Sequence, residues 1–199
     1  MTPLAEIDLV LASTSRYRRE LLERLTSHFR QESPQVDEAA LPDEAPAHLA
    51  VRLAAAKARA VAVRHPNALV IGSDQVADCG GIVLGKPGNI ANARRQLRES
   101  SGASVVFHTA LCLIDARDAT GREFAAIDTT RVVFRRLDDT EIERYLEQEQ
   151  PFDCAGSFKS EGLGIGLFER IETVDPTALV GLPLIALCRL LREASVTAI

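Results

Sequence analysis

Residues 7–15, Ile7-Asp8-Leu9-Val10-Leu11-Ala12-Ser13-Thr14-Ser15, begin as a short apolar run and end in three consecutive hydroxyl side chains. A short, partly β-branched apolar run is typical of a buried strand, and serine and threonine are favoured at the start of a helix. The stretch therefore predicts a strand, a turn and then a helix over about residues 17–27. Leu21, Leu22 and Leu25 would form the apolar stripe of that helix.

Outward from this stretch, apolar runs and helical patterns alternate along the chain. A short strand over residues 69–71 is expected to stop at Gly72-Ser73-Asp74, and a hairpin over 76–84 to turn at Gly80-Gly81. The remaining predicted elements are strands at 29–33, 105–116 and 123–136, a turn at 118–121, helices at 46–64, 89–99, 138–149 and 184–192, and loops at 34–46 and 154–166. This order predicts a mixed α/β sheet with helices on its faces.

The length and charge of the chain limit the kinds of partner it can have. The 199 residues suit one domain or two small lobes, and 23 Lys and Arg against 28 Asp and Glu leave a net charge of −5. This balance argues against a protein that coats nucleic acid or an anionic membrane. Any phosphate group must then be held by a local positive site.

Three further features bear on the compartment. Glu6 and Asp8 interrupt the N-terminal apolar run, so it lacks the pattern of a secretory signal. The longest uncharged apolar stretch, residues 176–188, is shorter than the roughly 20 residues that a membrane helix needs. The four cysteines form no close pair and the four histidines show no metal-ligand spacing. These features predict a cytoplasmic protein with reduced thiols, no membrane contact and no structural zinc.

Arg18 is the first candidate functional residue. On a helical wheel it falls between Leu21 and Leu25, on the inward face, in the first turn of the predicted helix. A guanidinium there opposes the helix dipole and is costly to bury, and a bound anion would relieve both problems. An inward ion pair with a protein carboxylate explains Arg18 equally well. Arg19 is expected to form a solvated pair with Glu23.

Two lysines, Lys57 and Lys86, are further candidates for binding an anion, but their sequence context indicates this less strongly than that of Arg18. Lys57 continues the row Leu49 and Leu53 on the apolar stripe of the second helix, where lysines usually extend to the rim. Lys86 lies in Gly85-Lys86-Pro87, whose neighbours restrict the backbone. The stretch is no Walker loop, because the motif GxxxxGK[ST] is absent.

Two carboxylates complete the candidate site. Asp74 follows a buried apolar strand, the position at which open α/β sheets place ligand chemistry, and Glu38 lies in a proline-bounded loop. Carboxylates that meet several cations are what a hydrated Mg²⁺ and a polyphosphate require. Glu38 also fits a solvated acidic loop.

Several sequence blocks together resemble the Maf family of nucleoside triphosphate pyrophosphatases and span nearly the whole chain in the family's order. The blocks are Leu11-Ala12-Ser13-Thr14-Ser15 with Arg18-Arg19 and Leu21-Leu22, Val36-Asp37-Glu38, Lys57-Ala58, Ser73-Asp74-Gln75, Gly85-Lys86-Pro87 and Ala155-Gly156-Ser157-Phe158. The resemblance implies hydrolysis between the α and β phosphates of a nucleotide, with a divalent cation (Mg, Mn or Co). It also implies a single domain over residues 1–199: a mixed twisted sheet in two lobes with a central cleft, similar to inosine triphosphate pyrophosphatases.

The resemblance also implies roles for individual residues. Asp74 matches the proposed general base of the family and Glu38 its metal-associated acid, so both are expected at the metal. The phosphate-binding positions are Ser13, Arg18, Lys57 and Lys86. The chain departs from the family pattern at Arg16, where proline is common and would preset the start of the helix. The resemblance further implies a homodimer.

Three positions distinguish branches of the family: Tyr17, Gln75 and Glu161. This set is similar to the YceF-type branch, which implies 7-methyl-GTP as the substrate. Methylated guanine is cationic, so the Tyr17 ring could stack on it, while Glu161 could accept hydrogen bonds from the guanine N1 and N2. Tyr17 packing on Leu21 and Glu161 capping the glycine-rich loop are the simpler interpretations. A dTTP or UTP pyrophosphatase and a non-catalytic nucleotide-binding regulator of cell division are the alternative functions.

Overall fold

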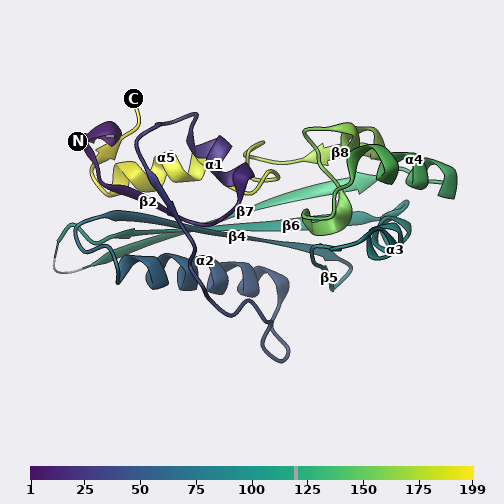
Figure 1. Ribbon diagram of the computed structural model, residues 1–199, viewed down its shortest axis with the longest axis horizontal. Helices are drawn as coiled ribbons and strands as arrows, with labels where there is room; N and C mark the ends of the chain where they lie inside the picture. The colour runs from purple at the N-terminus through teal and green to yellow at the C-terminus, as the bar shows by residue number, and fades with distance from the viewer. Residues whose placement is uncertain (119–120) are drawn as a thin grey trace. The chain divides into compact units, whose positions relative to one another are not determined.

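The structure, a computed structural model, describes residues 1–118 and 121–199 as a mixed α/β fold (Figure 1). The main sheet has the strand order β3-β2-β4-β6-β7-β8, with β5 beside β4. The strands are β1 (Thr2–Pro3), β2 (Leu9–Ala12), β3 (Arg30–Glu32), β4 (Leu69–Cys79), β5 (Ile82–Leu84), β6 (Ser104–Asp115), β7 (Arg122–Phe134), β8 (Phe168–Glu172) and β9 (Val196–Thr197). The helices are α1 (Arg16–Leu22), α2 (Pro46–Ala62), α3 (Ile90–Ser100), α4 (Asp139–Glu149) and α5 (Leu184–Glu193), with 3₁₀ helices η1 (Leu4–Glu6), η2 (Ala155–Ser157) and η3 (Leu163–Leu167). The expected mixed sheet with flanking helices is confirmed.

The chain divides into two compact units. The first comprises residues 1–74, 109–128 and 175–199, and the second comprises residues 75–108 and 129–174. Strands β4, β6 and β7 each contribute to both units. Part of the turn expected at 118–121 falls on residues 119 and 120, outside the described residues.

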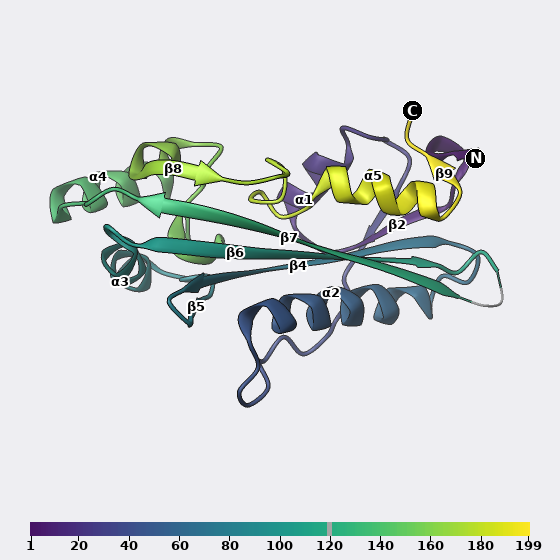
Figure 2. The same cartoon turned by 180° about the vertical axis from the view of Figure 1, so that it is seen from behind.

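In the first unit, β2 pairs in parallel with both β3 and β4, and Val10 lies opposite Val70. Helix α2 covers one face of these strands, while α1 and α5 cover the other, as Figures 1 and 2 show from opposite sides. A strand covered on both faces must be apolar at every position, which explains the uninterrupted apolar run of β2. The core on the α1 and α5 side comprises Leu4, Leu9, Leu11, Leu21, Leu22, Leu69, Ile71, Leu111, Leu113, Leu182, Leu184, Leu187, Leu190, Leu191, Ala194 and Val196.

The second unit is built on the β4–β5 hairpin, which turns at Gly80 and Gly81 with positive φ values of 62° and 92°. This confirms the expected hairpin. Helix α3 begins after the N-cap Asn89 and packs against α4 and η2. Helix α4 begins with a capping box formed by Asp138 and Glu141.

The prediction that the third strand stops at residues 72–74 is wrong. Strand β4 continues through this segment to Cys79. A Cβ at Gly72 would lie 2.3 Å from the carbonyl oxygen of Ala54 and 2.8 Å from the Ala58 Cβ. Gly72 therefore lets helix α2 approach the strand closely, and it is not a turn residue.

Other boundaries also differ from the sequence expectations. Helix α1 ends at Leu22, where tighter i to i−3 bonds from Arg24 and Leu25 replace the α-helical pattern. Strands β1, β8 and β9 were not expected from the sequence. In the structure β1 pairs with β9, and β8 pairs with β7. Across residues 1–118 and 121–199, no helix is both long enough and apolar enough to span a membrane.

Candidate active site

Lys57, Asp74 and Glu38 form one charged cluster in the first unit. The Lys57 Nζ lies 2.6 Å from the Asp74 Oδ1 and 2.6 Å from the Glu38 Oε1. Lys57 is 5% exposed and Asp74 is 7% exposed, whereas the Glu38 side chain is 59% exposed. The Lys57 side chain therefore does not extend to the rim, because it is bound to a buried carboxylate.

The local structure explains this cluster. Lys57 follows Leu49 and Leu53 along the face of α2 that covers the sheet. Successive side chains of a strand point to opposite faces, so Asp74 meets α2 while Ser73 points to the other side. There the Ser73 hydroxyl donates to the carbonyl oxygens of Ala110, at 2.8 Å, and Gly181, at 3.0 Å.

Arg18 is held in the first turn of α1 by a backbone group. Its Nε donates to the Gly181 carbonyl oxygen at 2.9 Å, and its Nη1 lies 3.5 Å from the Ser13 Oγ. Within the described residues, no carboxylate forms an ion pair with Arg18, so the expected inward pairing is not observed. Burial lowers the pKa of Arg18 from its usual value, and the negative charges of Asp74 and Glu38 partly restore that pKa.

The turn before α1 organises its own donors and acceptors. Ser15 is the N-cap: its Oγ accepts a hydrogen bond from the Arg18 backbone N–H at 3.4 Å. The Ser13 Oγ in turn accepts from the Ser15 N–H at 3.1 Å. Ser13 is 4% exposed. The predicted cap is confirmed, and it places the Ser13 hydroxyl beside the Arg18 guanidinium.

Tyr17 already carries a cation on its ring. The Arg16 guanidinium carbon lies 4.7 Å from the ring centroid, and the Arg16 Nη2 donates to the Tyr17 hydroxyl at 2.8 Å. Stacking of a cationic base on that face would require Arg16 to move aside, since two cations cannot share one ring face.

The segment that supports Arg18 was missed by sequence reasoning. Residues 175–183 place the Gly181 carbonyl between Arg18 and Ser73, and Gly181 has a φ of 118° that side-chain-bearing residues rarely adopt. Thr109 anchors the segment through a 3.0 Å bond to the Ala178 carbonyl. The sequence signal that could have revealed this segment is Gly181-Leu182-Pro183, because glycine and proline mark turns with a restricted backbone.

The remaining expected residues belong to the second unit. Gln75 directly follows Asp74 in β4, and Lys86 is exposed in the loop after β5. Glu161 is exposed in the glycine-rich stretch, where its carboxylate accepts a bond from the Ser160 hydroxyl at 3.2 Å. The structure thus places Ser13, Tyr17, Arg18, Glu38, Lys57 and Asp74 in one unit and Gln75, Lys86 and Glu161 in the other.

The donor set around Lys57 bears on metal binding. Among residues 1–118 and 121–199, no three His, Cys, Asp or Glu side chains are grouped closely enough to hold a metal ion. Glu38 and Asp74 nevertheless both direct an oxygen at the same ammonium group. Two carboxylate oxygens facing one position fit a hard divalent cation whose other ligands are phosphate oxygens and water.

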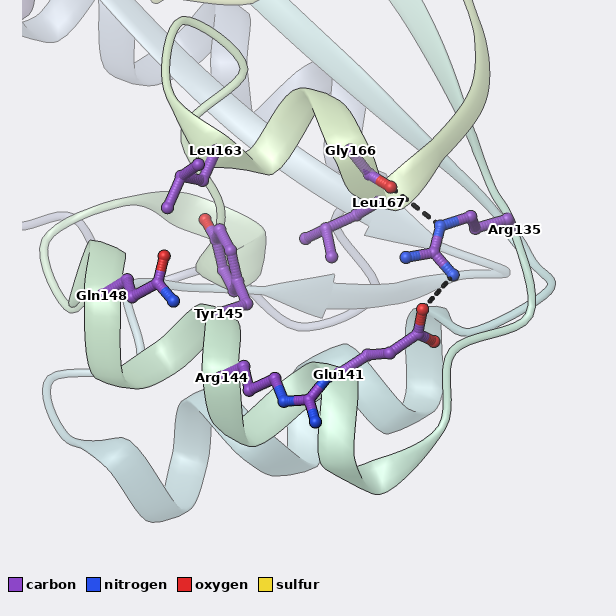
Figure 3. A pocket seen from close by; sticks show the side chains of 8 residues that line it. All are labelled: Arg135, Glu141, Arg144, Tyr145, Gln148, Leu163, Gly166 and Leu167. Carbon is purple, nitrogen blue, oxygen red and sulfur yellow. Dashed lines mark hydrogen bonds and ion pairs between the residues drawn. The ribbon is translucent and has the colours of Figure 1, made fainter.

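A pocket of about 230 Å³ lies in the second unit between α4 and η3 (Figure 3). Arg135 closes one end by donating to the Gly166 carbonyl at 2.8 Å and pairing with Glu141 at 2.7 Å. None of the expected site residues lines this pocket.

Comparison with known families identifies a match over residues 8–194 to the family described as Maf-like protein. Three similar relatives are each named 7-methyl-GTP pyrophosphatase. The relative from Xanthomonas oryzae pv. oryzae is 61% identical over 186 residues, covering 94% of this chain and 96% of the relative. The one from Aromatoleum aromaticum is 59% identical, covering 92% and 94% respectively. The one from a Polaromonas species is 56% identical, covering 98% and 88%.

Among solved structures, the Staphylococcus aureus Ham1 protein aligns with a TM-score of 0.44 and 14% sequence identity. The alignment covers 64% of this chain and 71% of that protein. At this score the likeness carries no conclusion about the site.

Proposed function

This chain belongs to the Maf-like protein family, and from that premise we propose that it hydrolyses 7-methyl-GTP to 7-methyl-GMP and pyrophosphate. It is a nucleotide pyrophosphatase, a hydrolase acting on phosphoric anhydrides, and its reaction removes a modified nucleotide from the pool. Three relatives with 56–61% identity over at least 92% of this chain carry that name. The observation that carries the proposal is the buried Lys57–Asp74 pair beside Arg18.

Asp74 is the general base. It accepts a proton from water as the water oxygen attacks the α-phosphorus, and the bond from that phosphorus to the bridging oxygen breaks to release pyrophosphate. The 2.6 Å contact with Lys57 fixes the Asp74 carboxylate, so the base is positioned before the nucleotide binds.

The triphosphate is held by cations from separate segments. They are Arg18 and Lys57, with Lys86 as the third cation that the family resemblance implies. The Arg18 Nε donates to the Gly181 carbonyl oxygen, and the Arg18 Nη1 lies 3.5 Å from the Ser13 hydroxyl. Guanidinium and hydroxyl donors at a helix start suit phosphate oxygens.

A divalent cation, Mg, Mn or Co, completes the proposal, with Glu38 and Asp74 as the carboxylates that would hold it. When bound, it would neutralise triphosphate charge and polarise the reacting phosphate. Lys57 contacts the same two carboxylates, so a bound cation would compete with its ammonium for their oxygens.

Recognition of the base is assigned to Tyr17, Gln75 and Glu161. Tyr17 would offer its ring to the cationic 7-methylguanine after Arg16 moves aside, and Glu161 would accept from N1–H and N2–H of guanine. The proposed setting is the cytoplasm, where nucleotides are found, and the proposed assembly is a homodimer, which light scattering tests.

A substrate panel tests the function. Pyrophosphate and phosphate are measured separately with 7-methyl-GTP, GTP, dTTP and UTP, with Mg, Mn or Co. The proposal predicts pyrophosphate as the product and the highest kcat/KM for 7-methyl-GTP. A preference for dTTP or UTP would contradict the base assignment, and tight binding without pyrophosphate release would indicate a non-catalytic nucleotide-binding regulator.

A further inference from the structure

Helix α3 holds the loop that carries Lys86 on both sides. The Gln96 Nε2 donates to the Gly85 carbonyl oxygen at 3.0 Å, and the Asn92 Nδ2 donates to the Pro87 carbonyl oxygen at 2.9 Å. Gln96 and Asn92 are four residues apart, so they lie on the same face of the helix. The two carbonyl groups that flank Lys86 are therefore both fixed, while the Lys86 side chain stays exposed.

A second residue sets the orientation of the Gln96 amide. The Ser157 hydroxyl donates to the Gln96 Oε1 at 2.5 Å, and both side chains are buried, Ser157 completely and Gln96 with 6% exposure. An amide has its acceptor on one side and its donors on the other. Because Ser157 takes the oxygen, the Gln96 nitrogen must face Gly85.

Ser157 is itself held in an uncommon conformation. Its φ is 63° and that of Gly156 is 74°. A residue with a side chain rarely adopts such a backbone conformation, and the conformation persists only where the surroundings demand it. The next residue, Phe158, is the anchor: its ring stacks edge-to-face on Phe107, Phe134 and Phe168 at centroid distances of 5.3, 5.6 and 4.8 Å.

We infer that Gln96 is a positioning residue for the reaction, which, oriented by Ser157, holds the Gly85–Pro87 loop so that the Lys86 ammonium meets the polyphosphate chain. The inference rests on the proposed function, because that function gives Lys86 its task. It also explains the Ala155-Gly156-Ser157-Phe158 block: Phe158 anchors it, and Ser157 connects it to the lysine loop through one amide.

The substitution Gln96→Glu tests the inference. The glutamate is nearly isosteric but presents an acceptor to the Gly85 carbonyl in place of a donor. We expect kcat/KM for 7-methyl-GTP to fall about ten- to a hundredfold, mainly through a higher KM, since small displacements of a binding group have effects of this order. Gln148→Glu is the matched control, because Gln148 is exposed on α4, and it should leave kcat/KM unchanged.

Coupling to Lys86 separates positioning from general stability. In a Lys86→Ala background, Gln96→Glu should cause no further loss. If the two losses multiply, the inference is overturned. If Gln96→Glu does not fold, Ser157→Ala takes its place, because it keeps Gln96 and its hydrogen bond to the Gly85 carbonyl. Its loss of kcat/KM should be smaller than that of Gln96→Glu and should likewise vanish in the Lys86→Ala background.

A binding measurement keeps this test independent of catalysis. Calorimetry measures the affinity for inorganic tripolyphosphate, and comparison with Lys86→Ala gives the contribution of Lys86. Gln96→Glu should weaken tripolyphosphate binding only while Lys86 is present. Equal weakening with and without Lys86 would overturn the inference. By contrast, a wild-type protein that binds tripolyphosphate in this coupled way but releases no pyrophosphate from any nucleotide would overturn the proposed function alone.

Discussion

The Lys57 Nζ lies 2.6 Å from the Asp74 Oδ1, and both groups are nearly inaccessible to water. The lysine comes from α2 and the aspartate from β4, so the contact fixes the helix on the strand. Removing Lys57 leaves the Asp74 carboxylate in a poorly hydrated place without its ion-pair partner, and such a loss is strongly destabilising. Lys57 without the Asp74 charge would still contact Glu38, so the two substitutions are not equivalent.

Asp74→Asn should abolish turnover while preserving the fold. The asparagine side chain can still accept a hydrogen bond from Lys57, but it cannot take a proton from water. We expect kcat to fall by about 10²–10⁴-fold, the usual contribution of a general base, with 7-methyl-GTP affinity retained in calorimetry. Asp43→Asn, in the exposed loop, is the control and should have wild-type activity. Wild-type pyrophosphate release by Asp74→Asn would refute the mechanism.

Lys57→Met should destabilise the protein and make it respond to metal. Without the ammonium, the buried Asp74 carboxylate has lost its charged partner, and urea unfolding should show a loss of about 3 kcal/mol. Mg²⁺ without nucleotide should raise the Tm of this variant more than that of the wild type, since Glu38 and Asp74 then face each other without a cation. Lys86→Met, at an exposed lysine, is the control for both measurements. An identical Mg²⁺ response in both proteins would argue against a metal at these carboxylates.

Gly181→Ala should damage both stability and phosphate binding. At a φ of 118° an alanine is strained by about 1–3 kcal/mol, and its Cβ would lie 3.5 Å from the Arg18 Nε. A shift of the Gly181 carbonyl would release Arg18 and Ser73 together, so KM should rise about tenfold. Gly80→Ala, also at positive φ but with nothing within 4 Å of its Cβ, should lose stability without a change in KM.

Arg16→Ala should shift the choice of base. It removes the guanidinium that lies over the Tyr17 ring and frees that face for a cationic base. An exposed cation–π contact is worth about 0.5–1 kcal/mol, so the ratio of kcat/KM for 7-methyl-GTP over GTP should rise about two- to fivefold. Arg19→Ala, which removes a neighbouring arginine paired with Glu23, should leave the ratio unchanged. An unchanged ratio in both variants would remove Tyr17 from base recognition.

Acid should weaken the protein in part through Asp115. Hydrogen bonds from Arg117 lower the pKa of this buried carboxyl below its ordinary value of 3.8. Because the folded-state pKa is the depressed one, this stabilisation is complete above pH 3.8 and is lost as the pH falls through the folded-state value. Asp115→Asn should therefore lower the free energy of unfolding by about 1–3 kcal/mol at pH 7, with a difference that shrinks below pH 3.8. A constant difference across that range would contradict the assignment.

The four cysteine thiols are free and differ in burial. All four cysteines are free in the structure, and burial raises the pKa of the Cys112 thiol to about 12. The absence of a close cysteine pair in the sequence had already indicated this. The sequence could not distinguish the buried Cys112 from the half-buried Cys154, because burial depends on tertiary packing.

Much of the fold was predictable because its signals are local. The Ser15 cap, the Asp138 capping box and the glycine turn at residues 80–81 each depend on neighbours within a few positions. The same reasoning failed at Gly72, where a glycine that suggests a turn lies inside a strand. Only the distant residues Ala54 and Ala58 explain why a side chain is excluded there.

The sequence by itself determined the alternating strands and helices, the resemblance to a family, and the residue types from which the site is built, since periodicity and motif spacing are written along the chain. Only the tertiary structure decided which groups meet. It paired Lys57 with Asp74 across 17 positions and placed Gly181 beside Arg18 across 163. The physical reason is that burial, ion pairing and carbonyl direction depend on helices and strands closing over one another, and no local pattern specifies that closure.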